Sequence, residues 1–366
     1  MLILLFLGVI LAWFIQHTIY KRRWNKGLDV TLSFMDSYAY EGDTSYLKQE
    51  IVNDKMLPIP ALEVRFSTNR NLEMQGEARE NTNVSDQSYQ REVFALWGRQ
   101  KVIRKIPFIC RKRGYYHIKK SEIVGYNLLY SYYYYMECEQ ETSIYVYPGR
   151  VDVKRIRLLC QAISGAVLAR RKLYPDPFEF SGIREYQRTD PMNLINWKAS
   201  AKTGSLMVNQ QDSTTNVQVV LLMDVEDSNI LKYEELVEES IRITSSLAGT
   251  LISQGMEFDI LSNGMEAMHL KSGAGLMQEL NQKLACVEVQ KVSEEICSVI
   301  EESDTGKTTD RIFVIISKNY TEHNRRAAEA LVSSGNQVLW VLPVHPYMKV
   351  ETRDYPGMQV IQWEVG

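Results

Sequence analysis

The chain has 366 residues and a formal net charge of −3, with 45% apolar and 24% charged residues. This composition is ordinary for a globular protein of two or three domains. It excludes a strongly basic nucleic-acid-binding protein, so no nucleic-acid partner is expected. The five cysteines form no Cys-x-x-Cys pair, which favours free thiols over a disulfide framework or a zinc site.

The amino-terminal segment is apolar. Residues 1–15 contain no charged residue, and Lys21, Arg22 and Arg23 follow after a short polar stretch. A helix of twenty residues spans roughly 30 Å, the hydrocarbon thickness of a bilayer. We therefore expect residues 1–24 to be a transmembrane anchor in a single-pass protein of the cell membrane. The positive charges that follow the apolar run predict that the bulk of the chain is cytoplasmic. A cleaved secretory signal is the alternative, but its positive start and small-residue cleavage site are missing.

Residues 25–150 carry the pattern of short strands separated by Gly, Pro, Asn and Asp. Alternating or strand-like runs recur over 28–34, 61–66, 93–97, 101–110, 115–119 and 143–147. This region is predicted to be an antiparallel β-sandwich domain. The polar stretch 71–90 is expected to be a long loop.

Residues 151–215 are predicted to connect the two halves of the chain. Apolar residues recur at helical spacing over 151–172, and Gly165 is a candidate for the end of that helix. The segment 181–208 has no clean period of 2 or 3.6, so it is not expected to be one simple element. It gathers charged and aromatic residues. These either pair with one another in a connector or form a docking or catalytic surface.

Residues 216–366 alternate apolar runs with helical patterns. The run 217–224 is typical of a central parallel strand, and a helix is expected to follow it up to about Ser253. Further strands are expected at 258–261, 267–270, 311–316, 337–342 and 359–363. Strand and helix alternation of this kind predicts a doubly wound α/β sheet.

The segment 181–208 also resembles a known family. Its residues Arg184-Glu185-Tyr186, Asp190-Pro191 and the run Ile-Asn-Trp-Lys-Ala-Ser-Ala at 195–201 look like the signature of the bacterial family called domain of unknown function fifty-eight. Members of that family have a von Willebrand factor A-like domain and are often encoded beside MoxR-type AAA+ ATPases. Two positions depart from the pattern, because Thr189 stands where Gly is usual and Asn193 where Arg is usual.

The resemblance completes the expected fold class, which is α+β and multidomain. It comprises an N-terminal transmembrane helix, an antiparallel β-sandwich and then, over 216–366, an α/β doubly wound von Willebrand factor A-like domain. The resemblance also implies a MoxR-type AAA+ ATPase as partner. The signature residues expected to bind are Arg184, Glu185, Tyr186, Asp190, Trp197, Lys198 and Ser200.

The resemblance raises the question of a divalent cation. A working domain of that type holds one with an Asp-x-Ser-x-Ser motif, because a hard cation needs several converging oxygen ligands. Here Asp224 and Ser228 match the motif and Glu226 replaces its first Ser, so these three are candidate ligands of Mg²⁺ or Ca²⁺. Lys318, in Ser317-Lys318-Asn319 after a later strand, brings a positive charge close to that ion. The alternative is that these acidic residues lie at the end of a strand and cap the amino terminus of the next helix, where negative charge is favourable.

Other reactive motifs are incomplete. The segment 305–308 reads Thr-Gly-Lys-Thr like the end of a P-loop, but Glu301 stands where the first Gly is required. No nucleotide is therefore expected to bind. The five histidines have no metal-ligand spacing, and no Gly-x-Ser-x-Gly motif exists. We therefore predict that the chain is not an enzyme.

Two functions remain as hypotheses. The first is a membrane-anchored cytoplasmic scaffold or adaptor whose A-like domain binds a protein partner. The resemblance makes that partner a MoxR-type AAA+ ATPase and the role the assembly or maturation of other proteins. The alternative is a metal-dependent hydrolase that uses the Asp224 cluster or Glu185 and Asp190. Ion pairs among Arg184, Glu185 and Asp190 would favour the adaptor, and convergence of the carboxylates on an open cleft would favour the hydrolase.

Overall fold

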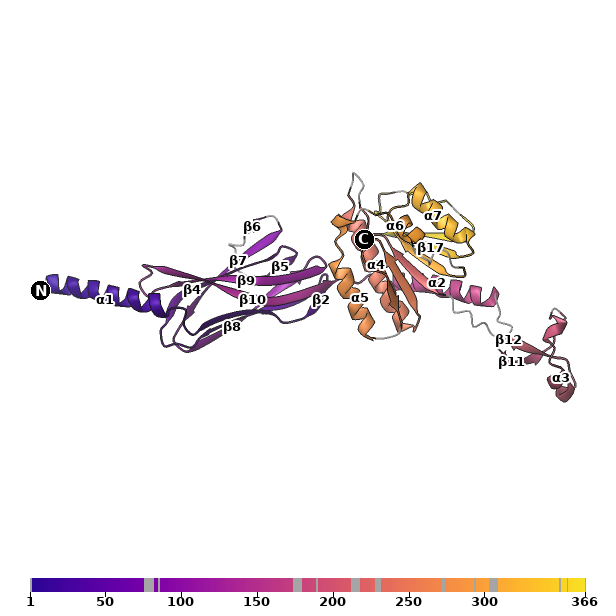
Figure 1. The fold of residues 1–366 in the computed structure, drawn as a ribbon, viewed down its shortest axis with the longest axis horizontal. Helices are drawn as coiled ribbons and strands as arrows, with labels where there is room; N and C mark the ends of the chain where they lie inside the picture. Colours follow the sequence, from indigo (N-terminus) through magenta and orange to yellow (C-terminus); the bar gives the residue numbers. More distant parts are fainter. Residues whose placement is uncertain are drawn as a thin grey trace. The chain divides into compact units, whose positions relative to one another are not determined.

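The computed structural model describes residues 2–75, 82–84, 86–173, 180–188, 190–211, 218–227, 232–271, 274–292, 294–302, 309–348, 350–353 and 355–365. The chain divides into two compact units. The first comprises Met1–Gly149 with Asn281–Cys286, and the second Arg150–Leu280 with Val287–Gly366. Figure 1 labels the elements of both units, which are described separately below.

The first element is helix α1 (Leu2–Arg23). Across the described residues, no helix combines the length and the apolar character needed to cross a membrane. This finding overturns the transmembrane helix expected at residues 1–24, and the expected fold class is wrong on that point. The sequence argument counted the apolar run from Met1 but gave too little weight to the polar residues Gln16, His17 and Thr18 that follow it.

The last turns of α1 pack on strands of the first unit. Tyr20 is 1% exposed, and its hydroxyl donates a 2.8 Å hydrogen bond to the carbonyl of Pro58. Trp24, just after the helix, is buried and stacks on Tyr134 with 5.7 Å between ring centroids. The carboxyl end of α1 therefore belongs to the hydrophobic core of this unit.

Two sheets build the rest of the first unit. The smaller is antiparallel with the order β1-β3-β8-β5, made of β1 (Leu28–Phe34), β3 (Thr44–Asn53), β8 (Gln100–Cys110) and β5 (Leu72–Met74). The larger has the order β2-β10-β9-β4-β7-β6, made of β2 (Tyr38–Tyr40), β10 (Tyr133–Tyr147), β9 (Gly114–Tyr126), β4 (Ile59–Asn69), β7 (Gln87–Leu96) and β6 (Thr82–Val84). Its pairs are antiparallel except for β2 with β10.

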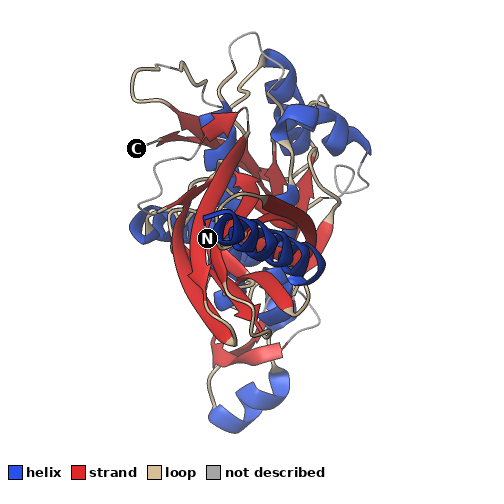
Figure 2. Cartoon of the chain, turned by 90° about the vertical axis from the view of Figure 1, so that its left-hand side faces the viewer, coloured by secondary structure: helices blue, strands red, loops and turns tan. Residues whose placement is uncertain are grey.

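The two sheets share one hydrophobic core. Alternating residues of β3 and β4, such as Leu47, Ile51 and Leu62, are fully buried in the same cluster. The strands of this unit are red in Figure 2. The loop expected at 71–90 is wrong for its described residues, because they form β5, β6 and the start of β7. Pairing with β8 and with one another satisfies their backbone groups despite the polar sequence.

The second unit contains a six-stranded sheet with the order β15-β14-β13-β16-β17-β18. Its strands are β13 (Val219–Met223), β14 (Phe258–Ser262), β15 (Met268–Leu270), β16 (Ile312–Ile316), β17 (Gln337–Val344) and β18 (Met358–Glu364). All neighbours are parallel except β14 with β15, which form the hairpin predicted at the Asn263-Gly264 turn. Every residue of β13 and β16 is buried, as expected for central parallel strands.

Helices cover this sheet. The second unit contains α2 (Val153–Leu173), α4 (Glu234–Ser253), α6 (Ile296–Glu302), α7 (Glu322–Ser333) and the short 3₁₀ turn η2 (Val289–Lys291), besides the signature segment described below. Helix α5 (Ala274–Cys286) begins in the second unit and ends in the first. Helices α2 and α4 pack together and contact β16. Alternate residues of β13, β16 and β17 share a hydrophobic core with α6 and α7.

Helix α2 does not end at Gly165, contrary to the expectation. A Cβ placed on Gly165 would meet nothing within 4 Å, so this glycine lies in an ordinary helical position. A glycine that ends a helix adopts the left-handed backbone conformation just after the last turn. A glycine inside a helix only weakens it, by roughly 1 kcal/mol.

The segment that carries the family signature forms a small element of its own. It comprises β11 (Phe180–Glu185), the 3₁₀ turn η1 (Met192–Leu194), α3 (Trp197–Thr203) and β12 (Met207–Gln211), with β11 and β12 antiparallel. We call it the signature element. Asn196 caps α3 by accepting a hydrogen bond from the amide of Ala199, and Gly204 ends it at φ 73°. The prediction that this segment is not one simple element is confirmed.

Candidate functional site at the carboxyl edge of the six-stranded sheet

Polar side chains gather where β13 and β16 end. The strand order reverses between these two neighbours, because β14 lies on one side of β13 and β17 lies beyond β16. In open α/β sheets, ligands bind at such a switch point, outside the carboxyl ends of the strands. Asp224 follows β13 directly, and Ser317 follows β16 directly. The topology therefore makes this edge the first candidate site of the second unit.

Asp224 is held by four hydrogen-bond donors. Its Oδ1 accepts from Asn263 Nδ2 at 2.7 Å and from the amide of Glu226 at 3.1 Å. Its Oδ2 accepts from the Ser317 hydroxyl at 2.6 Å and from Asn319 Nδ2 at 2.9 Å. Asp224 is only 2% exposed. Both carboxylate oxygens are thus occupied by protein groups, which is the arrangement a buried carboxylate requires.

The electrostatics of Asp224 follow from these contacts. Burial raises the pKa of its carboxyl above the ordinary value, because it penalises the charged form. Hydrogen bonds from Ser317, Glu226, Asn263 and Asn319 lower the pKa, but they do not offset the effect of burial. Each of these donors is neutral.

A buried ion pair lies beside Asp224. Lys318 Nζ is 2.6 Å from Asp227 Oδ1, and their side chains are 4% and 5% exposed. The same ammonium donates to Asn319 Oδ1 at 3.3 Å, and Asn319 Nδ2 in turn donates to Glu226 Oε2 at 2.8 Å. We call these linked residues, Asp224, Glu226, Asp227, Asn263, Ser317, Lys318 and Asn319, the carboxyl-edge network. Lys318 supplies a positive charge from within the protein.

The residues described here fit a bound Mg²⁺ or Ca²⁺ poorly. Asp224 and Glu226, two of the three predicted ligands, are brought together through Asn319, while Ser228 lies outside the described residues. A hard cation would have to displace hydrogen-bond donors from Asp224 and accept the Lys318 ammonium as a close neighbour. We therefore derive no ion-dependent step from this network.

Sequence reasoning found part of this network. Lys318 was expected near the acidic residues, and it pairs with Asp227. The role of Asn263 was missed, because its sequence indicated only a hairpin turn. The available signal was its position directly after β14, whose carboxyl end meets the same edge of the sheet.

The signature residues form a separate polar framework. Arg184 makes a two-pronged contact with Asp190, with Nη1 to Oδ2 at 2.6 Å and Nη2 to Oδ1 at 2.7 Å. This contact, together with a hydrogen bond from the amide of Gln187, lowers the pKa of Asp190 to about 2. Ser200 accepts a hydrogen bond from the amide of Met207 at 2.8 Å, which ties α3 to β12.

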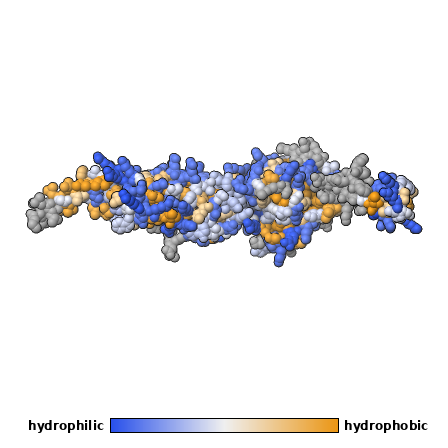
Figure 3. All heavy atoms as spheres, turned by 90° about the horizontal axis from the view of Figure 1, so that it is seen from below, coloured by the Kyte–Doolittle hydropathy of each residue, from blue (hydrophilic) through white to orange (hydrophobic). Residues whose placement is uncertain are grey.

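The remaining signature residues are not brought into that ion pair. Glu185, Trp197 and Lys198 are exposed, and Tyr186 is half-buried. Four large apolar side chains of this element are exposed, and Figure 3 shows hydrophobic atoms toward the right-hand end of the view, where the element lies. They are Ile183, Met192, Trp197 and Leu206.

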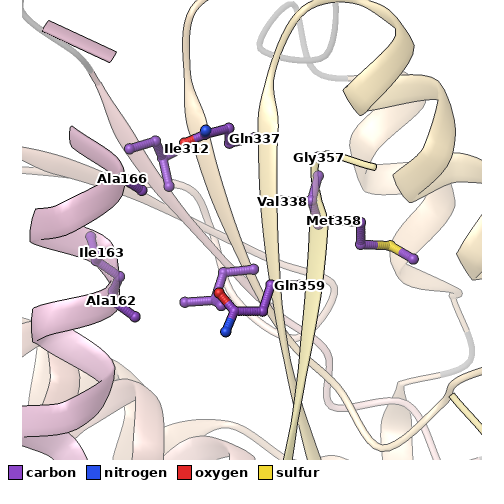
Figure 4. Close-up of a pocket in the computed structure, with 10 residues that line it drawn as sticks. Ala162, Ile163, Ala166, Ile312, Gln337, Val338, Gly357, Met358 and Gln359 are labelled. Carbon is purple, nitrogen blue, oxygen red and sulfur yellow. The ribbon is translucent and has the colours of Figure 1, made fainter. Parts of the chain in front are cut away.

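An apolar pocket lies elsewhere in the second unit. It has a volume of ≈ 240 Å³ and opens between α2 and the amino-terminal ends of β16, β17 and β18 (Figure 4). Ile163 and Ala166 line it from the helix, and Gln337 and Gln359 are its polar lining residues. Since no titratable side chain is among its lining residues, the pocket offers no acid or base for catalysis.

The P-loop-like residues at 305–308 lie outside the described part of the chain. The expectation that no nucleotide binds there stays a prediction.

Comparison with known proteins places the signature element and most of the six-stranded sheet in one family region. Residues 182–346 match the family described as "Protein of unknown function DUF58". The match runs from β11 through β17, so the resemblance seen in the sequence is confirmed over this segment. Residues 182–346, called the DUF58 region below, are thus similar to a family that is defined by its sequence.

None of the curated proteins matches the chain. Among solved structures, it is similar to the CARDB domain of a Pyrococcus furiosus protein, with 10% identity over 33% of this chain and 90% of that one and a TM-score of 0.22. It is also similar to a cohesin from Archaeoglobus fulgidus, with 11% identity over 32% and 91% and a TM-score of 0.22. A cohesin module from Clostridium perfringens gives 8% identity over 31% of this chain and 97% of that one, with a TM-score of 0.22.

Proposed function

We propose that the chain is a protein-binding adaptor whose DUF58 region engages a MoxR-type AAA+ ATPase during the assembly or maturation of other proteins. The partner class comes from the resemblance of the signature residues. The membrane-anchored form of this hypothesis is not retained, since the expected transmembrane helix is wrong.

The observation that carries the proposal is the exposure of large apolar side chains on the signature element. Met192 is 70% and Trp197 66% exposed on an element of about thirty residues that has only a small core of its own, around Ile195 and Val208. Exposed apolar surface bordered by polar residues is typical of protein interaction sites. Tryptophan is enriched among the residues that contribute most of the binding energy there. The Arg184–Asp190 pair and the Asn196 cap give this surface a defined shape.

The hydrolase alternative has weaker support. Asp190 has a pKa of about 2 because of its contact with Arg184, so it is a poor proton donor or acceptor near neutral pH. The raised pKa of Asp224 is a feature that favours a catalytic carboxylate. Its oxygens, however, are already occupied by four donors of the carboxyl-edge network.

The proposal is tested by measuring binding between the full chain and the MoxR-type ATPase of the same organism, both purified. We expect Trp197→Ala to weaken the complex at least about tenfold, as is usual when a hot-spot tryptophan of an interface is truncated. The matched control is Trp97→Ala, because Trp97 is 75% exposed but lies outside the DUF58 match. Equal affinities for the wild type and Trp197→Ala, or no complex at micromolar concentrations, would contradict the proposal.

A second arm separates adaptor from metal-dependent hydrolase. We expect binding to be the same in Mg²⁺ and in EDTA, because protein donors already occupy the Asp224 oxygens and Lys318 already pairs with Asp227. Loss of binding both in EDTA and in Asp224→Ala would instead establish an ion-dependent interaction. Metal-dependent hydrolysis of a model ester that Asp224→Ala abolishes would favour the alternative function.

A further inference from the structure

Three side chains with metal-binding chemistry converge where α6 and α7 begin. Glu295 directly precedes α6, Cys297 is the second residue of α6, and His323 is the second residue of α7. Their ligand atoms all lie within 4.8 Å of one another. Cys297 Sγ is 3.4 Å from Glu295 Oε2, and His323 Nε2 is 3.9 Å from the same oxygen.

We propose that Glu295, Cys297 and His323 form a Zn²⁺ site with a fourth position open to water. None of its three ligands belongs to the carboxyl-edge network, and the site does not depend on the proposed adaptor function.

The distances suit a tetrahedral ion. Zinc bonds of about 2.3 Å to sulfur and about 2.0 Å to nitrogen and oxygen place neighbouring ligand atoms roughly 3.3–3.6 Å apart. The separation between Cys297 Sγ and Glu295 Oε2 already meets this requirement. The separation between His323 Nε2 and Glu295 Oε2, 3.9 Å, exceeds the roughly 3.3 Å of a nitrogen–oxygen pair by about 0.6 Å, so the exposed His323 side chain has to rotate toward the ion.

The elements that carry the ligands are fixed by packing. Ile296 and Ile300 of α6 share a core with Ala328 and Leu331 of α7, so the two helix starts are held together. Asn263 Nδ2 donates a 2.7 Å hydrogen bond to the carbonyl of Glu294, which fixes the chain just before Glu295. Ligands carried on rigid elements lose little conformational entropy when a metal binds.

Thr321 fixes the start of α7. Its hydroxyl accepts a hydrogen bond from the amide of Asn324, which holds the turn that contains His323. Cys297 is buried, whereas the side chains of Glu295 and His323 are more than half exposed. The thiol thus lies at the base of the cluster, and an ion and its water can approach from the solvent side.

The ligand types select the metal. A thiolate is a soft ligand that suits zinc and is a poor ligand for Mg²⁺ or Ca²⁺. On binding, the S–H bond of Cys297 breaks, a Zn–S bond forms, and the proton leaves to solvent. The thiolate and the Glu295 carboxylate then carry two negative charges against the two positive charges of the ion, so the neutral imidazole completes an electrically balanced site.

The test uses the full chain, freed of metal and kept reduced with a phosphine, and titrates it with Co²⁺ as a spectroscopic probe for zinc. We expect one equivalent to bind, with a near-ultraviolet thiolate-to-cobalt charge-transfer band that Zn²⁺ displaces. Cys297→Ser should abolish the band, and His323→Ala and Glu295→Gln should weaken metal binding at least about tenfold. The latter two replace exposed side chains and should leave the fold intact.

Matched controls decide the assignment. Cys286→Ser removes an exposed thiol, and His269→Ala removes a half-exposed imidazole that contacts Asp259. Both variants should keep the band and the affinity of the wild type. The proposal is overturned if no band forms at micromolar Co²⁺, if the band survives in Cys297→Ser, or if Cys286→Ser removes it.

Discussion

Two buried carboxylates, one in each unit, show opposite electrostatics. Glu63 of β4 is 3% exposed, and its oxygens accept hydrogen bonds from Arg65, Arg91 and the hydroxyl of Tyr126. Asp224 is equally buried and accepts from amides and a hydroxyl. Two of the three Glu63 partners are charged, whereas none of the direct Asp224 donors is.

This difference in partners decides the pKa. Burial raises the pKa of Glu63, but hydrogen bonds from Arg91, Arg65 and Tyr126 outweigh it and bring the value down to about 2. Burial also raises the pKa of Asp224, and there the neutral donors do not offset it. For the pKa of a buried carboxylate, the number of hydrogen bonds thus matters less than the charge of the donors.

The largest effect is expected from removing the positive charge beside Asp224. Lys318→Ala leaves the buried carboxylate of Asp227 without its partner, which should destabilise the second unit by about 3–5 kcal/mol. Urea denaturation followed by circular dichroism measures the change. The double variant Lys318→Met, Asp227→Leu should recover most of the loss, because a matched apolar pair removes both charges. A loss below about 1 kcal/mol for the single variant would show that the pair is hydrated.

A smaller effect is expected at Asp224 itself. In Asp224→Asn, one acceptor oxygen becomes an amide donor that faces donors such as Asn319 Nδ2. A buried donor left without an acceptor should cost about 1–3 kcal/mol. Because the folded-state pKa of Asp224 is raised, its stabilising contribution is present below the unfolded pKa near 3.8 and is lost as pH rises through the folded value. The stability difference between the wild type and Asp224→Asn should therefore grow toward low pH.

The smallest effect is expected at Glu63. Glu63→Gln should cost about 1–2 kcal/mol at pH 7, because both arginines are more than 40% exposed and solvent screens their attraction. Since the folded-state pKa is lowered from 4.5 to about 2, this contribution is present above pH 4.5 and is lost as pH falls toward 2. Urea midpoints measured from pH 3 to 7 should thus show the opposite pH trend to Asp224→Asn, and parallel trends would refute the comparison.

Local patterns predicted most elements of the second unit. The apolar runs at β13 and β16 and the turn after β14 indicate buried parallel strands and a hairpin, and these elements are present. Amino-acid type alone sufficed there, because burial on both faces leaves little choice of residue. The helix at residues 2–23 was also predictable, but its interpretation as a membrane span was wrong.

By itself, the sequence determined the alternation of strands and helices in the second half of the chain after residue 216, the acidic residues after β13 and the signature of the DUF58 region. Only the tertiary structure decided which polar groups meet. Asn263, Ser317 and Asn319 converge on Asp224 from strands far apart in the chain, and His323 reaches Cys297 from another helix. The physical reason is that a hydrogen bond or a metal site depends on distances of a few ångström in space. Parallel strands bring their carboxyl ends together, and the separation of these ends along the sequence does not reveal which side chains will meet there.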